Sequence, residues 1–460
     1  MKLPVNIPKL DDLFSDSSNS DKKQKVVSRL YELLSTDIGK DREKEYLHWD
    51  RLKYKELPEQ VENHEEWWYL IKFRRSNGYR KLPFCSKDGS QFVYWIPDRL
   101  QQLLHVVDQQ ASGRVQIAAE VTNPATRDRY LVSSLIEEAI TSSQLEGAST
   151  TNKVAKEMLR DRRRPKDKSE RMIFNNYRAM SFIREVVDQP LSKNLLLELH
   201  RVVTDGTLDD SSAVGRFRTS KEEVAIYDER DNTLLHEPPH ADELERRIGT
   251  LIDFANSSEK HGEFLHPVIR SILLHFMIGY DHPFVDGNGR TARALFYWSM
   301  AKHGYWVMEH ISISTILKKG PAKYARSFLF TESDGNDTTY FLDFNLSVII
   351  RAIKGLQQYL ARKANEIKQV EQMLGSSFFT KNLNYRQLAI ISYALRHPNG
   401  TFSIEGHRAS HNISYPTARS DLLELVNYEL LDKRKIGNAF IFTPVEEMQE
   451  KLSQLKETFR

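Results

Sequence analysis

The chain has 460 residues, of which 40% are hydrophobic and 28% charged, and its formal net charge is +3. This composition permits two or three domains with buried cores, excludes a disordered chain, and gives no argument for a nucleic-acid partner. A single cysteine, Cys85, excludes an intramolecular disulfide framework and a cysteine-rich zinc site. The sequence has no apolar run of membrane-spanning length and no signal-peptide pattern at its N-terminus, so we expect a cytoplasmic protein without a membrane partner.

Residues 1–110 are predicted to form an N-terminal α+β domain. The stretch "EEWWYLIKFRR" indicates an aromatic helix, and "LPFCSKDGSQFVYWIP" indicates a hairpin that turns at Asp88-Gly89. We interpret Trp67 and Trp68 as core or interface residues, and no chemistry is assigned to this region.

Residues 111–365 are predicted to be mainly helical, because apolar residues recur at spacings of three and four in successive segments. One non-helical island, "VAIYDERDNTLLHEPP", indicates a hairpin that turns near Asp231-Asn232 and ends at Pro238-Pro239. The hairpin lies upstream of the stretch that carries the chemistry.

Residues 375–460 are predicted to form a winged helix-turn-helix, with three helices followed by the hairpin "DKRKIGNAFIFTP". Residues 381–460 hold 11 Lys and Arg against 9 Asp and Glu, a net charge of +2. That charge supports DNA as a partner only weakly, and a protein-contact or dimerisation module is an equally good interpretation.

The stretch "DHPFVDGNGRTAR", residues 281–293, is a polar loop between two segments with helical patterns. Gly287 and Gly289 let the backbone approach a ligand closely, and a glycine-rich turn at a helix N-terminus binds anions. Arg290 and Arg293 share one face of the following first turn, where each positive charge costs about 0.3–1 kcal/mol against the helix dipole. The pattern therefore predicts a polyphosphate ligand, which arginine binds bidentately.

The other residues of the loop complete a reaction centre. His282 titrates near neutral pH and suits a general base, and Asp286 would contact phosphate through a bridging Mg²⁺ ion. Phe284 is expected to point into the core, and Asp286 or Asn288 to cap the next helix. A base, a metal ligand and an anion-binding site are the groups required for attack of a hydroxyl on a nucleoside triphosphate. Zinc is discarded because His275 and His282 have no third ligand at a matching spacing.

The loop resembles the signature of the Fic (Fido-domain) family of protein adenylyltransferases, H-x-F-x-[DE]-G-N-G-R-x-x-R. Its eight fixed positions are all matched here: His282, Phe284, Asp286, Gly287, Asn288, Gly289, Arg290 and Arg293. The resemblance implies AMP transfer from Mg²⁺-bound ATP to a Ser, Thr or Tyr hydroxyl of a protein. Whether the enzyme itself is also a target is left open.

The resemblance also implies a role for each residue. His282 would be the catalytic base and Asp286 the metal ligand. Asn288, with the N–H groups of Gly287 and Gly289, would hold the α-phosphate. Arg290 and Arg293 would hold the β- and γ-phosphates. The hairpin would be the family's "flap", which docks an extended target segment by strand addition.

A second resemblance lies upstream, in a predicted helix over residues 131–147. Many Fic proteins carry an inhibitory helix with the pattern [ST]-x-x-x-E-[GN], and "SSQLEG" supplies Ser142, Glu146 and Gly147. Gly147 is expected to end the helix. A carboxylate near Arg293 would occupy the position of the γ-phosphate, so the family pattern implies an autoinhibited enzyme.

The expected fold class is mainly α: a helical Fic core with a β-hairpin flap, an N-terminal α+β region and a C-terminal winged helix-turn-helix. Two alternative functions remain open at this point. One is a winged-helix DNA-binding regulator whose Fic domain only senses nucleotide. The other is a bifunctional enzyme that also removes AMP. A homodimer is likewise left open.

Overall fold

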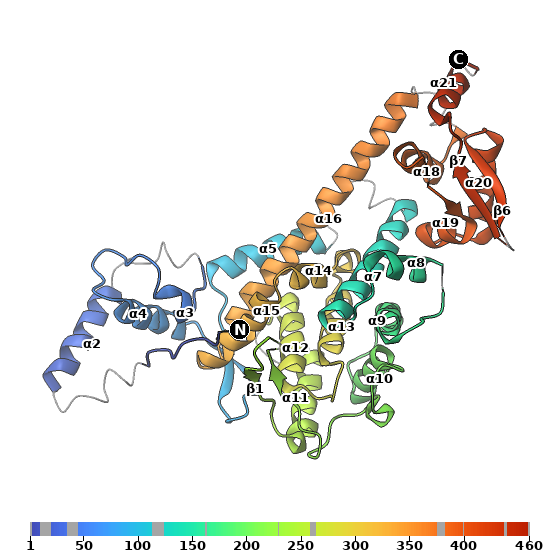
Figure 1. The fold of residues 1–460 in the computed structure, drawn as a ribbon. Coiled ribbons are helices and arrows are strands. Elements are labelled where there is room, and N and C mark those ends of the chain that lie inside the picture. The colour runs from blue at the N-terminus through green and yellow to red at the C-terminus, as the bar shows by residue number, and fades with distance from the viewer. Residues whose placement is uncertain are drawn as a thin grey trace. The chain divides into compact units, whose positions relative to one another are not determined.

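The computed structural model describes residues 2–9, 20–34, 45–112, 124–161, 163–228, 230–257, 264–374, 382–398, 400–436 and 439–458. Within these residues the chain is mostly helical, with three small antiparallel sheets (Figure 1). It divides into two compact units: Met1–Gln109, Arg178–Tyr305 and Ile316–Ile350 form the first, and Gln110–Tyr177, Trp306–Thr315 and Arg351–Arg460 form the second. The mainly α fold expected from the sequence is confirmed. No helix among the described residues is long and apolar enough to cross a membrane.

The first unit begins with helices that carry an aromatic face. Its N-terminal elements are α2 (Ser20–Leu34), α3 (Trp49–Leu52), α4 (His64–Ser76), β1 (Arg80–Cys85), β2 (Gln91–Tyr94) and α5 (Asp98–Ala111). Helix α4 starts where the Asn63 side chain accepts from the Glu66 N–H, and it buries Trp67 and Trp68, as the aromatic pattern predicts. Strands β1 and β2 pair antiparallel, and the turn includes Gly89 at φ 84°, which confirms the hairpin.

The β1–β2 hairpin contacts the helical part of the same unit directly. Val93 forms a parallel bridge with Asp337, and the N–H of Lys87 donates to the Tyr280 hydroxyl over 3.0 Å. Residues 80–95 therefore help to support the helix that precedes the motif loop.

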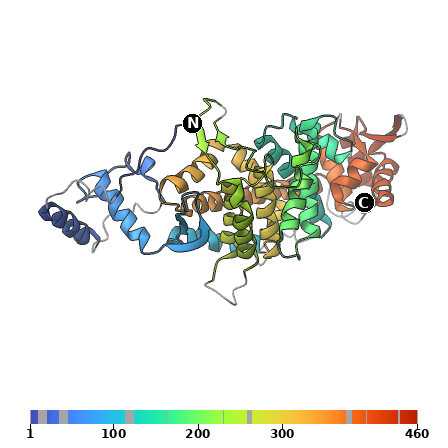
Figure 2. The same ribbon diagram turned by 90° about the horizontal axis from the view of Figure 1, so that it is seen from below.

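Two helices of the first unit hold the motif loop between them. Helix α12 (Pro267–Asp281) is buried on nearly every side, as its apolar sequence dictates, and it packs along α13 (Asn288–Lys302) (Figures 1 and 2). The same unit also contains α10 (Lys193–Thr204), η2 (Ser211–Ala213), β3 (Ile226–Tyr227), β4 (Leu234–His236), η3 (Ala241–Glu243), α11 (Leu244–Asn256) and α15 (Pro321–Ser333). Strands β3 and β4 pair antiparallel with Asn232 at φ 53° in the turn, which confirms the predicted second hairpin.

The second unit contains α7 (Pro124–Leu145) and the C-terminal elements. Its other elements are α8 (Asn152–Arg160), η5 (Trp306–His310), α18 (Tyr385–Arg396), β5 (Phe402–Ser403), α19 (Ile404–His411), α20 (Tyr415–Asn427), β6 (Leu431–Ile436), β7 (Ala439–Pro444) and α21 (Met448–Thr458). Helix α19 packs against α7 and α8, and the three C-terminal strands form an antiparallel sheet in the order β5-β7-β6. The order of elements over 385–444 agrees with a winged helix-turn-helix, which remains an interpretation.

Four of the described helices have residues in both units. They are α5, α9 (Lys168–Glu185), α14 (Ile313–Lys318) and α16 (Thr339–Leu374). The domain limits predicted at residues 110, 365 and 375 are sequence-based and remain predictions.

Candidate functional site

The motif loop is a sharp turn with a left-handed residue at each end. Helix α12 ends at Asp281, and His282 follows as its C-cap with φ 45° and ψ 57°. Gly287, at φ 83°, is the N-cap of α13. A Cβ atom on Gly287 would lie 2.6 Å from Cγ2 of Thr204, so the glycine is required both by conformation and by space. The expected side-chain cap is wrong: α13 has none, because Asp286 accepts from the Gly287 N–H and Asn288 bonds elsewhere.

The imidazole of His282 has a defined tautomer. Its Nδ1 lies 3.3 Å from the carbonyl oxygen of Gly279, one turn back in α12. A carbonyl oxygen only accepts, so Nδ1 carries the proton and the basic lone pair of the neutral ring is at Nε2. This tautomer suits a general base that acts through Nε2.

Phe284 is fully buried, as expected, and its ring stacks on His200 of α10 with centroids 3.7 Å apart. The Nδ1 of His200 accepts from the Gly215 N–H over 3.0 Å, and its Nε2–H donates to the Asp286 carbonyl over 2.9 Å. Burial is the main reason that the pKa of His200 is lowered to about 4, so the ring is neutral at physiological pH. His200 therefore fixes both the aromatic member and the acidic member of the loop.

Asn288 closes the loop on itself. Its Oδ1 accepts from the Phe284 N–H over 2.9 Å, and its Nδ2 donates to the Phe284 carbonyl over 2.8 Å. Both ends of the amide thus bind one backbone residue, and the side chain is 2% exposed. The phosphate contact expected of Asn288 remains a prediction.

Asp286 and Arg290, four residues apart in the chain, form an ion pair. The Arg290 Nη2 lies 3.6 Å from the Asp286 Oδ2, and Nη1 donates to the carbonyl of Val203 over 2.8 Å. The Asp286 side chain is 53% exposed, whereas Arg290 and Arg293 are both buried. The positive charge of Arg293 helps to lower the pKa of His275 to about 3, although burial is the larger cause. The structure thus places two buried cations in α13, and one of them, Arg290, lies beside an accessible carboxylate.

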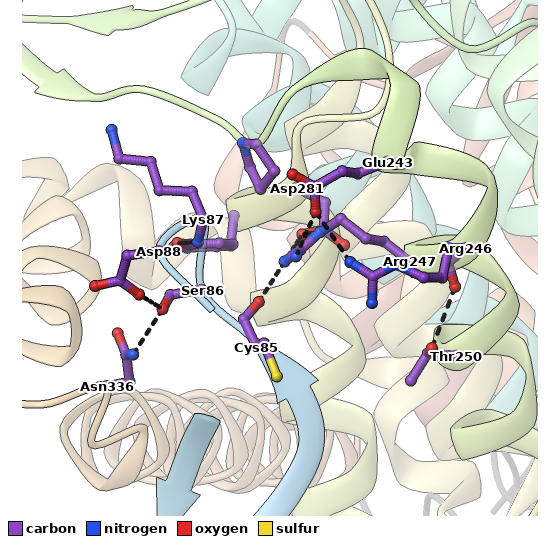
Figure 3. A network of polar contacts seen from close by, with 12 residues as sticks. Cys85, Ser86, Lys87, Asp88, Glu243, Arg246, Arg247, Thr250, Asp281 and Asn336 are labelled. Atoms are coloured by element: carbon purple, nitrogen blue, oxygen red, sulfur yellow. Dashed lines mark hydrogen bonds and ion pairs between the residues drawn. The ribbon is translucent and has the colours of Figure 1, made fainter. Parts of the chain in front are cut away.

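Three side chains that bind the end of α12 and the start of the loop were not identified from the sequence. Arg218 donates to the carbonyls of Asp281 and His282, and the Nε2–H of His236 donates to the carbonyl of Tyr280. Arg247 of α11 binds the Asp281 carboxylate over 2.6 and 2.8 Å and also the Cys85 carbonyl (Figure 3).

Burial raises the pKa of Asp281 to about 6, although Arg247 opposes that rise. A sequence signal existed for His200, which occupies the apolar face of its helix together with Leu196, Leu199 and Val203.

The predicted inhibitory segment lies in the second unit. Helix α7 ends at Leu145, and Gly147 has φ 90°. The N–H of Ala148 donates to the Ser143 carbonyl and that of Gly147 to the Gln144 carbonyl, a Schellman cap. The predicted helix end at Gly147 is thereby confirmed. Ser142 is buried and Glu146 is partly exposed, and their inhibitory role stays a prediction.

Comparisons with known proteins find relatives for part of the chain. A model of the Fic/DOC family matches residues 190–300. A protein adenylyltransferase Fic from Nematostella vectensis is 36% identical over 110 residues, which are 24% of this chain and 23% of that protein. Its counterpart from Drosophila virilis is 35% identical over 129 residues, 28% of this chain and 24% of that one. The chain therefore spans only about a quarter of the length of these relatives.

A solved Fic family protein from Desulfovibrio desulfuricans G20 aligns with a TM-score of 0.47 and 19% identity, over 75% of this chain and 95% of that one. The family match covers the loop with its complete motif and both flanking helices up to residue 300. Residues 190–300, which carry the complete motif, are therefore similar to the Fic/DOC family.

Proposed function

We propose that the protein is a protein adenylyltransferase that moves AMP from ATP to a hydroxyl group of a protein. The observation that carries this proposal is the complete motif on one turn between α12 and α13, with Nδ1 of His282 directed at the Gly279 carbonyl. Relatives that are 33–36% identical over 110 to 129 residues are named protein adenylyltransferase Fic, which supports the same reaction. We place the protein in the cytoplasm as part of this proposal.

The proposed reaction assigns each step to a residue of the loop. The Nε2 of His282 takes the proton of the target hydroxyl while the hydroxyl oxygen attacks the α-phosphorus of ATP. The bond from that phosphorus to the oxygen bridging to the β-phosphate breaks, and pyrophosphate leaves. The N–H groups of the Gly287–Gly289 turn face the anion, and Arg290 and Arg293 hold the departing phosphates.

Asp286 fits a magnesium ligand. Mg²⁺ is commonly held by one or two carboxylates together with substrate phosphates and water, and Asp286 offers one accessible carboxylate beside the proposed phosphate site. Among the described residues there is no group of three or more His, Cys, Asp or Glu side chains that could hold a metal ion. When bound, Mg²⁺ would neutralise charge on the phosphates.

The proposal is tested with ATP labelled on the α-phosphate. The protein is incubated with this ATP, Mg²⁺ and a cell lysate, and labelled bands are sought, including the protein itself. Mass spectrometry of the labelled peptide then identifies the acceptor as Ser, Thr or Tyr. Absence of label with wild type and with Glu146→Gly would exclude the proposed reaction.

Two alternative functions can be tested separately. Removal of AMP is an activity that a carboxylate such as Glu146 would serve by orienting water, and a chase of labelled protein without ATP measures it.

DNA binding is favoured by three exposed basic residues of β6, namely Lys433, Arg434 and Lys435, and by exposed Arg419 on α20. The same segment would serve equally as a protein-contact or homodimer surface.

A further inference from the structure

His282 has a backbone conformation that needs support. A left-handed conformation in a residue other than glycine costs on the order of 1–3 kcal/mol and persists where neighbouring structure enforces it. The position of the imidazole follows from this backbone, because the side chain starts at the left-handed residue. Whatever holds the backbone of His282 therefore also sets the position of the proposed base.

One arginine supplies most of that support. The Nε–H of Arg218 donates to the His282 carbonyl over 2.8 Å, and its Nη2 donates to the Asp281 carbonyl over 3.3 Å. The backbone N–H of Arg218 donates to the next carbonyl, that of Pro283, over 2.9 Å. Arg218 is 7% exposed. Three consecutive carbonyl groups at the end of α12 are thus fixed by a single buried residue.

The same guanidinium also binds the segment that follows the β3–β4 hairpin. Its Nη2 donates to the carbonyl of Pro239, which follows β4 by three residues. The strand itself has a second link to α12, because His236 donates from Nε2 to the Tyr280 carbonyl over 2.7 Å and contacts Glu332 through Nδ1. The hairpin is therefore tied at two points to the segment that ends in His282.

Stability alone does not account for a charged group in this position. The three side-chain hydrogen bonds of Arg218 all go to carbonyl oxygens, and the nearby Asp281 carboxylate is bound by Arg247. Burial lowers the pKa of Arg218, although the charge of Asp281 opposes that change. A buried charge of this kind is costly compared with an apolar side chain, so a role in alignment explains it better than a role in packing.

We propose that Arg218 is a positioning residue through which the β3–β4 hairpin controls the backbone of His282. Docking of a target segment on the hairpin then fixes the positions of Pro239, Arg218 and His282 together. This inference rests on the proposed adenylyltransferase function, because it takes the hairpin as the target-docking element and His282 as the base.

The test compares Arg218→Met and Arg218→Lys with the matched control Arg216→Met. Arg216 belongs to the same segment, but its guanidinium pairs with Glu222 and the Ser212 carbonyl at the surface. For Arg218→Met we expect kcat for AMP transfer to fall at least tenfold, with KM for ATP unchanged. Arg218→Lys keeps the charge but cannot reach several carbonyls at once, so it should recover only part of the loss. Arg216→Met should transfer like wild type.

Two further measurements separate alignment from general damage. In a His282→Ala background, Arg218→Met should cause no additional loss of transfer, because the residue acts through that histidine. Amide hydrogen exchange of Arg218→Met should rise both at 226–239 and at 278–286, and remain at the wild-type level in α16. Wild-type kcat in Arg218→Met, additive losses in the double variant, or faster exchange in only one of the two segments would overturn the proposal.

The exchange experiment does not depend on activity. Should wild type and Glu146→Gly transfer no AMP, the proposed function fails, while coupled exchange at the hairpin and the loop still reports whether Arg218 links them. Should transfer occur without any coupling, the function stands and this inference fails.

Discussion

The ring of His200 donates from Nε2 to the carbonyl oxygen of Asp286 over 2.9 Å, although the two residues are 86 positions apart in the chain. The other ring nitrogen accepts from the Gly215 N–H. The ring thus joins two segments of backbone and requires one neutral tautomer, with the proton on Nε2. The orientation of the proposed metal ligand depends on a residue outside the motif.

Replacement of His200 should raise the Mg²⁺ concentration that gives half of the maximal rate of AMP transfer. His200→Asn keeps an acceptor near the Nδ1 position and loses the donor to Asp286, whereas His200→Gln keeps a donor near Nε2 and loses the acceptor. A buried hydrogen bond left unmade costs about 1–3 kcal/mol, so we expect transfer to fall about tenfold or more in His200→Asn and less in His200→Gln. Titration of Mg²⁺ against initial rate checks this, and equal half-saturation in both variants and wild type would contradict it.

The pKa of His200 predicts loss of stability in acid. The unfolded residue titrates near 6.5, and burial lowers the folded pKa to about 4, so the unfolded state binds the proton first as pH falls. The neutral ring therefore contributes its full stabilisation above pH 6.5, and this contribution is lost as pH falls toward 4. At pH 5 His200 should lower the free energy of unfolding by about 2 kcal/mol relative to neutral pH. Urea unfolding of wild type and His200→Gln at pH 7.5 and pH 5 measures it.

The glutamine variant is a suitable reference because His48 and His275, whose pKa values burial lowers to about 3, remain in both proteins. We expect the free energy of unfolding to drop less between the two pH values in His200→Gln. Identical drops would assign the acid sensitivity to the other buried histidines.

Removal of the proposed base should separate binding from chemistry. His282→Ala is expected to lower AMP transfer by about 10²–10⁴-fold, the usual contribution of a general base. ATP affinity, measured by calorimetry, should change less than threefold, because the phosphate-binding residues are elsewhere on the loop. His105→Ala, at an exposed position of α5, is the control. Near-wild-type labelling by His282→Ala would remove this histidine from the mechanism.

The sequence predicted the helices, the three hairpins and the loop because each follows from local patterns: apolar spacing, turn residues and a contiguous motif. It did not predict the supports of the loop, since these depend on long-range contacts. The links from Arg218 to His282 and from Arg247 to Asp281 join residues 64 and 34 positions apart, and nothing local to either partner specifies the other. Asn288 illustrates a second limit: its type suits a phosphate, and yet its amide is bonded to Phe284.

The C-terminal segment should not bind one DNA sequence tightly. Its exposed basic residues offer few phosphate contacts, and the net charge over residues 381–460 is only +2 (11 Lys and Arg, 9 Asp and Glu). We expect weak, salt-sensitive retention of long duplexes and a further loss when Lys433, Arg434 and Lys435 are replaced together by alanine. A nanomolar complex with one defined duplex at physiological salt would instead favour a DNA-binding regulator.

Glu146→Gly should be a better transferase than wild type. The expectation rests on the resemblance of "SSQLEG" to the inhibitory pattern and on the chemistry of one cation. A carboxylate that pairs with Arg293 prevents that arginine from holding the γ-phosphate, so ATP would bind without presenting its α-phosphate to the hydroxyl. Loss of a carboxylate is ordinarily neutral or harmful to an enzyme, which makes a gain of activity informative. Arg293→Ala should abolish transfer with or without Glu146, because it removes the residue for which the carboxylate and phosphate compete.

Auto-labelling with labelled ATP measures these outcomes in wild type, Glu146→Gly and the double variant. Glu146→Gln removes the charge without adding a glycine, so it should also label better than wild type if electrostatic competition is the cause. Glu137→Gln is the matched control, since Glu137 lies on α7, which ends just before Glu146, and pairs with Lys156 at the surface. Labelling of Glu146→Gly at the wild-type level would refute the inhibitory assignment. Stable AMP on Glu146→Gly, with labelled protein losing its AMP only when Glu146 is present, would show that the carboxylate serves removal as well.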